Sequence, residues 1–359
     1  MANLVSRHIN NYLRRVLTRA RRFAWGDRMF TIYPSFSKKR VSKAGDAVRD
    51  GTEQQEDTDV IENWRASHNY VLNTFQATLR RHARGKDITV AQRLKRRLTI
   101  YDKLKRQHEM KLARMHDIAG CRLIFENIET LNETRRQILS SKFKHKLRNS
   151  LADYDYIATP KKTGYRGVHD VYEYVSYSGS AENWNGLQIE LQYRTKTQHA
   201  WATAVEIVGS LTGNEAKFDR GDEDHQQFFR LSSEILARRH ENKKSCFPDM
   251  TDKELRVELD QLEKKIGVLR FLEGIHVSAE QLKDARNLIL RMGNRGVLTV
   301  YGFTKTKIAL ERYFELEEEE GDDDIVFVRG DTNDGIRSAF RNYFSDARDF
   351  TSLMRQAIG

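Results

Sequence analysis

The strictest alternation of apolar and polar residues lies between residues 187 and 194. The apolar positions are Leu187, Ile189, Leu191 and Tyr193, and the polar ones between them are Gln188, Glu190, Gln192 and Arg194. A period of two predicts a β-strand with one packed face, so the other face carries an acid, amides and a guanidinium in one row. A solvent-facing strand gives the same alternation. Residues 195–206 follow with helical character, however, and together the two segments predict a site at a strand end.

Apolar spacing predicts further elements in the first 250 residues. The helices are expected over 37–50, with Ser37 as N-cap, around 64–79, and over 127–143. The strands are expected over 118–125, which is apolar enough to be central, and over 154–157, 168–177 and 186–194. These elements predict an α+β fold, an open mixed β-sheet flanked by helices. His68 lies on the apolar stripe of the second helix, and we interpret it as a core histidine.

The last 110 residues predict a smaller helical or α+β unit. Two helices are expected over 251–292, strands over 297–301 and 325–328 with a helix between them, and a terminal helix over 336–346. The helix between the strands runs into residues 315–324, of which eight are acidic. We therefore divide the chain into a basic N-terminal extension (1–36), a main domain (37–245) and a C-terminal domain (246–359). Within the extension, residues 4–24 predict a basic amphipathic helix.

Composition adds an uneven charge to this outline. Residues 1–250 hold 45 Lys+Arg and 30 Asp+Glu, a net charge of +15, whereas residues 251–359 hold 17 and 21, a net charge of −4. The basic part of the chain is expected to bind polyphosphates or nucleic acid. The acidic C-terminal domain is expected to fold back onto this basic part. No apolar run is long enough to span a bilayer, and no secretory signal is evident, so we expect a cytoplasmic protein. Cys121 and Cys246 are expected to be reduced, ordinary thiols.

Two segments carry candidate phosphate-binding chemistry. Residues 80–122 hold 14 Lys+Arg and four acids; a solvated helix face gives such a run, but its self-repulsion favours a bound anion. The loop 159–167 contains three cations, two glycines and Tyr165, which looks exposed. Cations for phosphates and a ring for a base suit a nucleotide. The sequence has no Gly-rich phosphate loop, so side chains must hold the phosphates.

Three segments in order resemble the signature segments of the RelA/SpoT synthetase domain. They are Asp117-Ile118-Ala119-Gly120-Cys121-Arg122, residues 156–169, and Glu190-Leu191-Gln192-Tyr193-Arg194-Thr195. The resemblance spans roughly residues 37–243 and implies that family's nucleotidyltransferase-like fold. It also implies an ATP-dependent pyrophosphokinase, which transfers the β,γ-pyrophosphate of ATP to a ribose hydroxyl.

Carried onto matching positions, the resemblance assigns roles to single residues. Asp117 and Glu190 would be the catalytic pair that holds Mg²⁺, with Glu190 also helping to deprotonate the attacking hydroxyl. The ATP-binding residues would be Arg93, Lys95, Lys103 and Arg122. The acceptor-binding residues would be Lys161, Lys162, Tyr165, His169, Gln192 and Arg194, with Tyr165 stacking on the acceptor base. Phosphoryl-type transfer depends on positioning and charge neutralisation, which this set supplies.

The acceptor and the regulation follow from finer resemblances. The segments 33–45, 63–68 and 199–206 resemble toxic small alarmone synthetases, several of which modify the 3′ CCA end of tRNA. The alternative is a (p)ppGpp synthetase that uses GDP or GTP and has a regulatory tail. The C-terminal domain resembles that of CapRel-type fused toxin–antitoxins, which implies autoinhibition and a phage capsid protein as trigger. Their inhibitory Tyr-x-x-Tyr element corresponds here to Phe340-Arg341-Asn342-Tyr343, and a structural role for Phe340 and Tyr343 remains the alternative.

Overall fold

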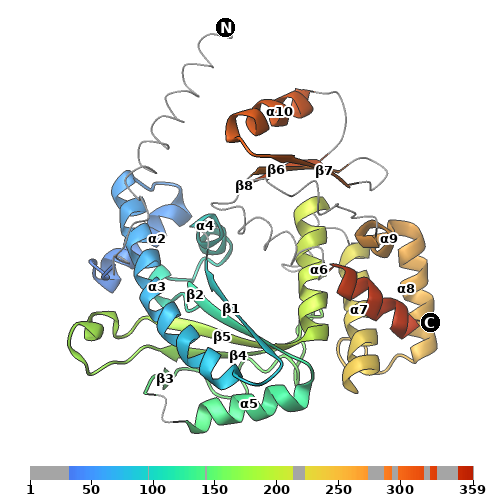
Figure 1. Ribbon diagram of the computed structural model, residues 1–359, viewed down its shortest axis with the longest axis horizontal. Helices are drawn as coiled ribbons and strands as arrows, with labels where there is room; N and C mark the ends of the chain where they lie inside the picture. Colours follow the sequence, from blue (N-terminus) through green and yellow to red (C-terminus); the bar gives the residue numbers. More distant parts are fainter. Residues whose placement is uncertain are drawn as a thin grey trace.

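The structure is a computed structural model (Figure 1). It describes residues 32–95, 97–141, 144–212, 223–273, 287–292, 298–318, 324–329 and 347–358. The expected N-terminal helix over 4–24 lies outside the described residues. Phe340 and Tyr343 lie outside them as well, together with the expected terminal helix over 336–346.

The centre of the fold is a five-stranded mixed sheet, which confirms the predicted fold class. Its strands are β1 (Ile88–Leu94), β2 (Ala119–Phe125), β3 (Lys146–Leu147), β4 (Val168–Glu173) and β5 (Gln188–Thr195). Their order is β1-β2-β5-β4-β3, with β2 and β5 parallel and every other pair antiparallel. The three strands that carry signature residues, β2, β5 and β4, are therefore neighbours in the middle of the sheet.

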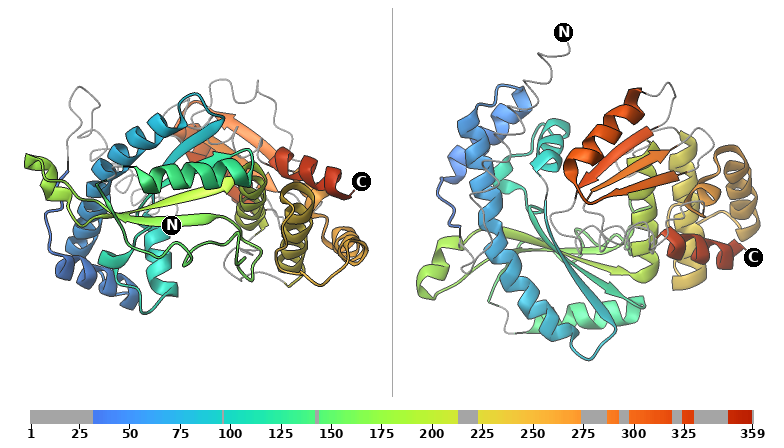
Figure 2. Two further views of the ribbon diagram at one scale, coloured as in Figure 1. Left: turned by 90° about the horizontal axis from the view of Figure 1, so that it is seen from below. Right: turned by 45° about the horizontal axis from the view of Figure 1, so that its top comes forward.

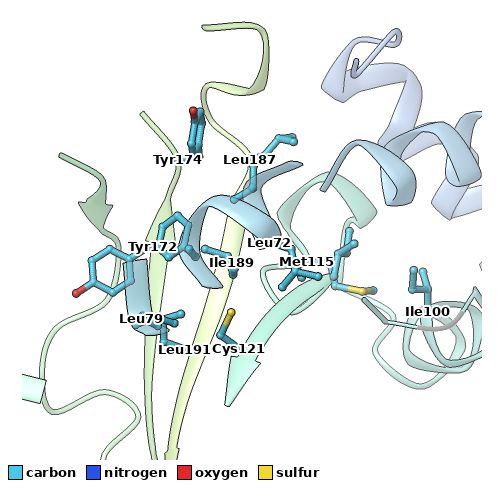
Figure 3. Packing of buried hydrophobic residues seen from close by; sticks show 14 of the residues in the cluster. Leu72, Leu79, Ile100, Met115, Cys121, Tyr172, Tyr174, Leu187, Ile189 and Leu191 are labelled. Atoms are coloured by element: carbon cyan, nitrogen blue, oxygen red, sulfur yellow. The ribbon is translucent and has the colours of Figure 1, made fainter. Parts of the chain in front are cut away.

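Helices cover the apolar face of the sheet. Ser37 caps α2 (Lys38–Asp50) as predicted, and Gly51 ends it with a φ of 69°. The long helix α3 (Gln55–Ala83) buries Leu72, Phe75 and Leu79, which belong to one core with the apolar row of β2 and β5. Figure 3 shows Leu72 and Leu79 of this helix beside Cys121, Ile189 and Leu191 of the two strands. Because successive side chains of a strand point to opposite faces, the polar row of β5 faces away from α3. The helices α4 (Arg97–Arg106) and α5 (Ile128–Ser140) and two short 3-10 turns, Leu112–Arg114 and Gly179–Trp184, complete this part of the chain.

The structure corrects some of the expected boundaries. The segment 154–157 is a turn with a single bridge from Asp155 to Val168, because Asp155 Oδ1 accepts the backbone N–H groups of Ile157 and Ala158 at 3.1 and 3.0 Å. A side chain that satisfies its own backbone competes with a strand ladder. β1 was not predicted, and α3 begins at Gln55, nine residues before the start of the helix expected around 64–79.

A second core lies beside the sheet and is helical. It joins α6 (Lys196–Thr212), α7 (Glu223–Glu241), α8 (Asp252–Ile266), α9 (Val268–Glu273) and the helical residues 347–358. Figure 1 shows the chain's C-terminus beside α7 and α8. The buried cluster includes Phe229 of α7, Leu255 of α8 and Phe350 of the last helix. One core therefore contains residues from both sides of the expected domain boundary at 245/246.

A small antiparallel sheet forms the remaining described part of the C-terminal region. Its strands are β6 (Asn287–Met292), β7 (Leu298–Phe303) and β8 (Asp324–Arg329), in the order β7-β6-β8, and α10 (Thr306–Glu318) packs against it (Figure 2). The last residues of the two helices expected over 251–292 are thus a strand, β6. In the part of the chain that the structure describes, no helix is long and apolar enough to cross a membrane.

Candidate active site

The polar face of the sheet opens into a cavity of about 1020 Å³. Its walls come from β1, β2, β4, β5, α4, α6 and the segment 154–165. Eleven of the twelve sequence-predicted residues of the main domain line it: Arg93, Lys95, Lys103, Asp117, Arg122, Lys161, Tyr165, His169, Glu190, Gln192 and Arg194. Lys162 does not line the cavity and is exposed.

Strand register explains why residues far apart in sequence meet here. In the parallel β2–β5 pair, Gly120 lies opposite Glu190 and Arg122 opposite Gln192. In the antiparallel β4–β5 pair, His169 lies opposite Gln192. Residues on one face alternate along each strand, so these side chains project to the same side. Glycine opposite Glu190 leaves the carboxylate without a cross-strand side chain on the β2 side, whereas Val171 lies opposite it on β4.

One side of the cavity is organised around Asp117. Lys95 Nζ and Lys103 Nζ each lie 2.8 Å from one of its carboxylate oxygens. Burial raises the pKa of Asp117, but the two ammonium groups outweigh it and hold the pKa below its usual range. Burial lowers the pKa of Lys95, against the opposing effect of Asp117. Asp117 thus balances two of the cations that line the cavity together with Arg93.

The second carboxylate, Glu190, is held by two histidines and an amide. His169 Nδ1 lies 3.1 Å from Oε1, His116 Nε2 lies 3.7 Å from Oε1, and Gln192 Nε2 donates to Oε2 at 2.5 Å. Burial raises the pKa of Glu190, but His169 and Gln192 outweigh it and leave the pKa well below its usual range. Burial lowers the pKa of His169, yet Tyr165 and Glu190 together raise it to about 9.

The side expected to take the acceptor is organised around Tyr165. The ring is only 9% exposed, so the expectation of an exposed tyrosine is wrong. Its hydroxyl lies 2.6 Å from His169 Nε2 and accepts from Arg194 Nε at 3.1 Å. Burial raises the pKa of Tyr165, but Arg194 and His169 outweigh it and lower the pKa to about 8. Lys161 Nζ lies 4.3 Å from the Tyr156 ring centroid and 5.3 Å from that of Tyr165.

Two guanidinium groups meet between these sides. Arg122 Nε and Arg194 Nη2 both donate to Gln192 Oε1, at 3.4 and 3.3 Å. Repulsion from Arg194, followed by burial, lowers the pKa of Arg122 to about 10. Paired cations that repel each other gain when an anion binds between or beside them.

Among the lining residues without a predicted role, three act on the predicted ones. His116 precedes Asp117 and contacts Glu190, Tyr156 packs edge-on against Tyr165 and His169, and Glu206 of α6 raises the pKa of Arg122. His116 adjoins a signature segment, and the other two lie within segments quoted for the resemblance. Spacing alone could not identify them, because each reaches the cavity from a turn or helix whose orientation depends on the tertiary fold.

The donor set suits Mg²⁺. Asp117 and Glu190 line one cavity with carboxylate oxygens, the donors that a hard divalent cation prefers, and phosphate oxygens and water complete such sites. No group of three or more His, Cys, Asp or Glu side chains among the described residues is arranged to hold a metal by itself. Cys121 and Cys246 are both free thiols.

The geometry agrees with comparisons to known proteins. Residues 92–207 match the family described as "Region found in RelA / SpoT proteins", and this segment contains most of the cavity lining. The matched region contains all three signature segments, so the match confirms the resemblance to the RelA/SpoT synthetase domain over these residues. The comparison with curated proteins finds no match.

Solved structures of small alarmone synthetases are also similar to this chain. Small alarmone synthetase 1 from Bacillus subtilis, bound to its product pppGpp, is 21% identical with a TM-score of 0.41, covering 56% of this chain and 94% of that one. Small alarmone synthetase 2 from Bacillus subtilis is 21% identical with a TM-score of 0.40, covering 49% and 91%. A GTP pyrophosphokinase family protein from Streptococcus pneumoniae is 18% identical with a TM-score of 0.38, covering 60% and 94%.

Proposed function

We propose that this RelA/SpoT-type pyrophosphokinase uses ATP as donor and the 3′ CCA end of tRNA as acceptor, and thereby inhibits translation. The observation that supports this reaction type is that one cavity holds both carboxylates. Asp117 lies between two lysines on one side of it, and Glu190 lies beside His169 on the other. The acceptor ribose oxygen attacks the β-phosphorus of ATP. The bond from that phosphorus to the α,β-bridging oxygen breaks, and AMP leaves with the electron pair.

The residues divide this work between the two substrates. Arg93, Lys95, Lys103 and Arg122 would bind the ATP phosphates, because all four cations line the cavity. Asp117 and Glu190 would hold Mg²⁺, which would neutralise phosphate charge. Glu190 would take the proton of the attacking hydroxyl, with His169 orienting its carboxylate at 3.1 Å.

The acceptor would lie against Tyr165, His169, Gln192 and Arg194. Tyr165 makes two hydrogen bonds through its hydroxyl, so it orders this side of the cavity. Stacking of a base on its ring requires a neighbour such as Lys161 to move aside, because the ring is nearly covered. We choose tRNA over GDP or GTP because residues 1–250 carry a net charge of +15, which favours a polynucleotide.

We further propose that the C-terminal domain restrains the enzyme until a phage protein such as capsid protein binds it. The support is the charge difference between the two parts of the chain, +15 against −4. Phe340 and Tyr343 would occupy the ATP side in the restrained form. The variants Phe340→Ala and Tyr343→Ala test this directly: each should make expression of a tolerated protein toxic, and an unchanged growth rate with folded protein would count against it.

One experiment tests the acceptor. ATP labelled in its β- and γ-phosphates is incubated with the protein and tRNA, GDP or GTP, and the labelled product is identified. We expect label on tRNA together with release of AMP. Label on GDP or GTP with tRNA present would establish the alarmone synthetase instead. Absence of transfer to all three would contradict the proposal.

A further inference from the structure

The loop 159–167 packs on a helix that lies outside the matched RelA/SpoT region. Ser233 Oγ of α7 donates to the carbonyl oxygen of Gly164 at 2.6 Å. Gly164 has a φ of +90°, and a Cβ there would lie 3.0 Å from the Trp201 ring and 3.1 Å from Ser233 Cβ. The loop backbone therefore lies directly against α6 and α7, with no room for a side chain between them.

A buried ion pair fixes the next part of this loop. Glu241, the last residue of α7, pairs with Arg166, and their side chains are 3% and 4% exposed. The same carboxylate accepts from Thr195 Oγ1 and, at 3.0 Å, from Gln198 Nε2. Thr195 and Gln198 in turn cap the start of α6 through two 3.1 Å hydrogen bonds. One carboxylate thus ties the loop to the end of β5 and the beginning of α6.

This junction is adjacent to the acceptor side of the cavity. Arg166 lies between Tyr165, which bonds to His169 and Arg194, and Gly167. A Cβ at Gly167 would lie 3.1 Å from Tyr165 Oη and 3.3 Å from Arg194 Cγ. Displacement of Arg166 therefore moves groups that face the acceptor. The ATP side is held differently, because Lys95 and Lys103 belong to the segment after β1 and to α4.

We propose that Glu241 is a positioning residue for the acceptor side, and that α7 transmits the state of the C-terminal helices to the loop 159–167. The same helix packs against the last helical segment, with the Phe229 and Phe350 ring centroids 6.2 Å apart and His240 Nε2 3.2 Å from Leu353 O. A ligand or partner that shifts residues 347–358 thereby reaches acceptor binding through α7. The kinetic part of this inference rests on the proposed function.

The test compares Glu241→Gln and Ser233→Ala with Ser232→Ala in the full chain. Ser232 is a matched control, because it is the buried neighbour on the same helix and its hydroxyl contacts Phe229 O and Trp201 instead of the loop. The kinetics are measured with the acceptor that the wild type labels, whether tRNA, GDP or GTP. With this acceptor, Glu241→Gln should raise the acceptor KM about tenfold and Ser233→Ala about threefold. Both should leave the ATP KM within about twofold of wild type, as should Ser232→Ala for both substrates.

Amide hydrogen exchange provides a readout independent of activity. Exchange of residues 159–167 should quicken about tenfold in Glu241→Gln, while β2 and β5 stay protected. Unchanged exchange in that loop, or equal increases in the ATP and acceptor KM, would overturn the inference, as would a Ser232→Ala variant that matches Ser233→Ala. Failure of the wild type to label any acceptor would contradict the proposed function alone, since the exchange result still decides the role of Glu241.

Discussion

The ion pair between Arg135 and Asp170 offers the sharpest prediction about stability. Arg135 of α5 donates to Asp170 of β4 through Nη2 at 2.6 Å and through Nε at 3.1 and 3.2 Å, and it also reaches Leu151 O at 3.2 Å. The Asp170 side chain is completely buried and that of Arg135 is 10% exposed. Arg135→Met keeps most of the volume but leaves a buried carboxylate without its partner, which should lower the free energy of unfolding by about 3–5 kcal/mol.

A double-mutant cycle separates the cost of the unpaired buried carboxylate from the net contribution of the ion pair to the free energy of unfolding. Replacing both residues, as in Arg135→Met with Asp170→Val, removes both buried charges, so the double variant should lie within about 1 kcal/mol of wild type. Urea unfolding, followed by tryptophan fluorescence and by circular dichroism, measures the stability of the single and double variants, provided that the two transitions coincide. If Arg135→Met lowers stability by less than about 1 kcal/mol, or if the double variant is as unstable as the sum of the singles, the reasoning is refuted.

Three further predictions concern catalysis, pH and salt. Asp117→Asn or Glu190→Gln should reduce transfer by about 10³-fold or more in protein that circular dichroism shows to be folded; labelled ATP measures the transfer, and near-normal activity in either variant would contradict the assignment. Burial lowers the pKa of His68 from 6.5 to about 4, despite its hydrogen bond to Trp64 O, so the folded state binds fewer protons and loses roughly 3 kcal/mol as pH falls through that range. His68→Gln should flatten this part of the pH–stability curve, and an equally steep curve would show that another group is responsible. Binding of tRNA through six or more phosphates should weaken about 10³-fold or more between 50 and 200 mM salt, and fluorescence anisotropy that shows no such loss would count against tRNA.

The sequence predicted the site best where the chemistry lies on regular strands. The alternation in β5 placed Glu190, Gln192 and Arg194 on one face, and strand register then brought Arg122 and His169 beside them. Side chains whose direction depends on turns were harder to predict. Lys161 and Lys162 are sequence neighbours of equal charge, yet only Lys161 lines the cavity, because the 159–167 turn points its neighbour outward.

Other misses also have physical causes. β1 alternates Ile88, Val90 and Leu94 and holds one basic residue, but it is a short strand inside the basic segment 80–122 and was not distinguished from it. The side chain of Asp155 turned a strand-like segment into a turn. Glu241 gave no signal in the sequence, because an acid at the end of a helix is ordinarily solvated. Its importance depends on Arg166, 75 residues earlier, being buried against it.

The helical core contains residues from both sides of 245/246, so the main domain and the C-terminal helices depend on each other for folding. A polypeptide that stops before α8 would expose the apolar surface of α7 that Leu255, Leu259 and Phe350 cover. Such a fragment should aggregate or be degraded before its activity could be judged. Gene fission at this point would therefore not yield two proteins that fold independently, and selection would act on α7 and the C-terminal helices together.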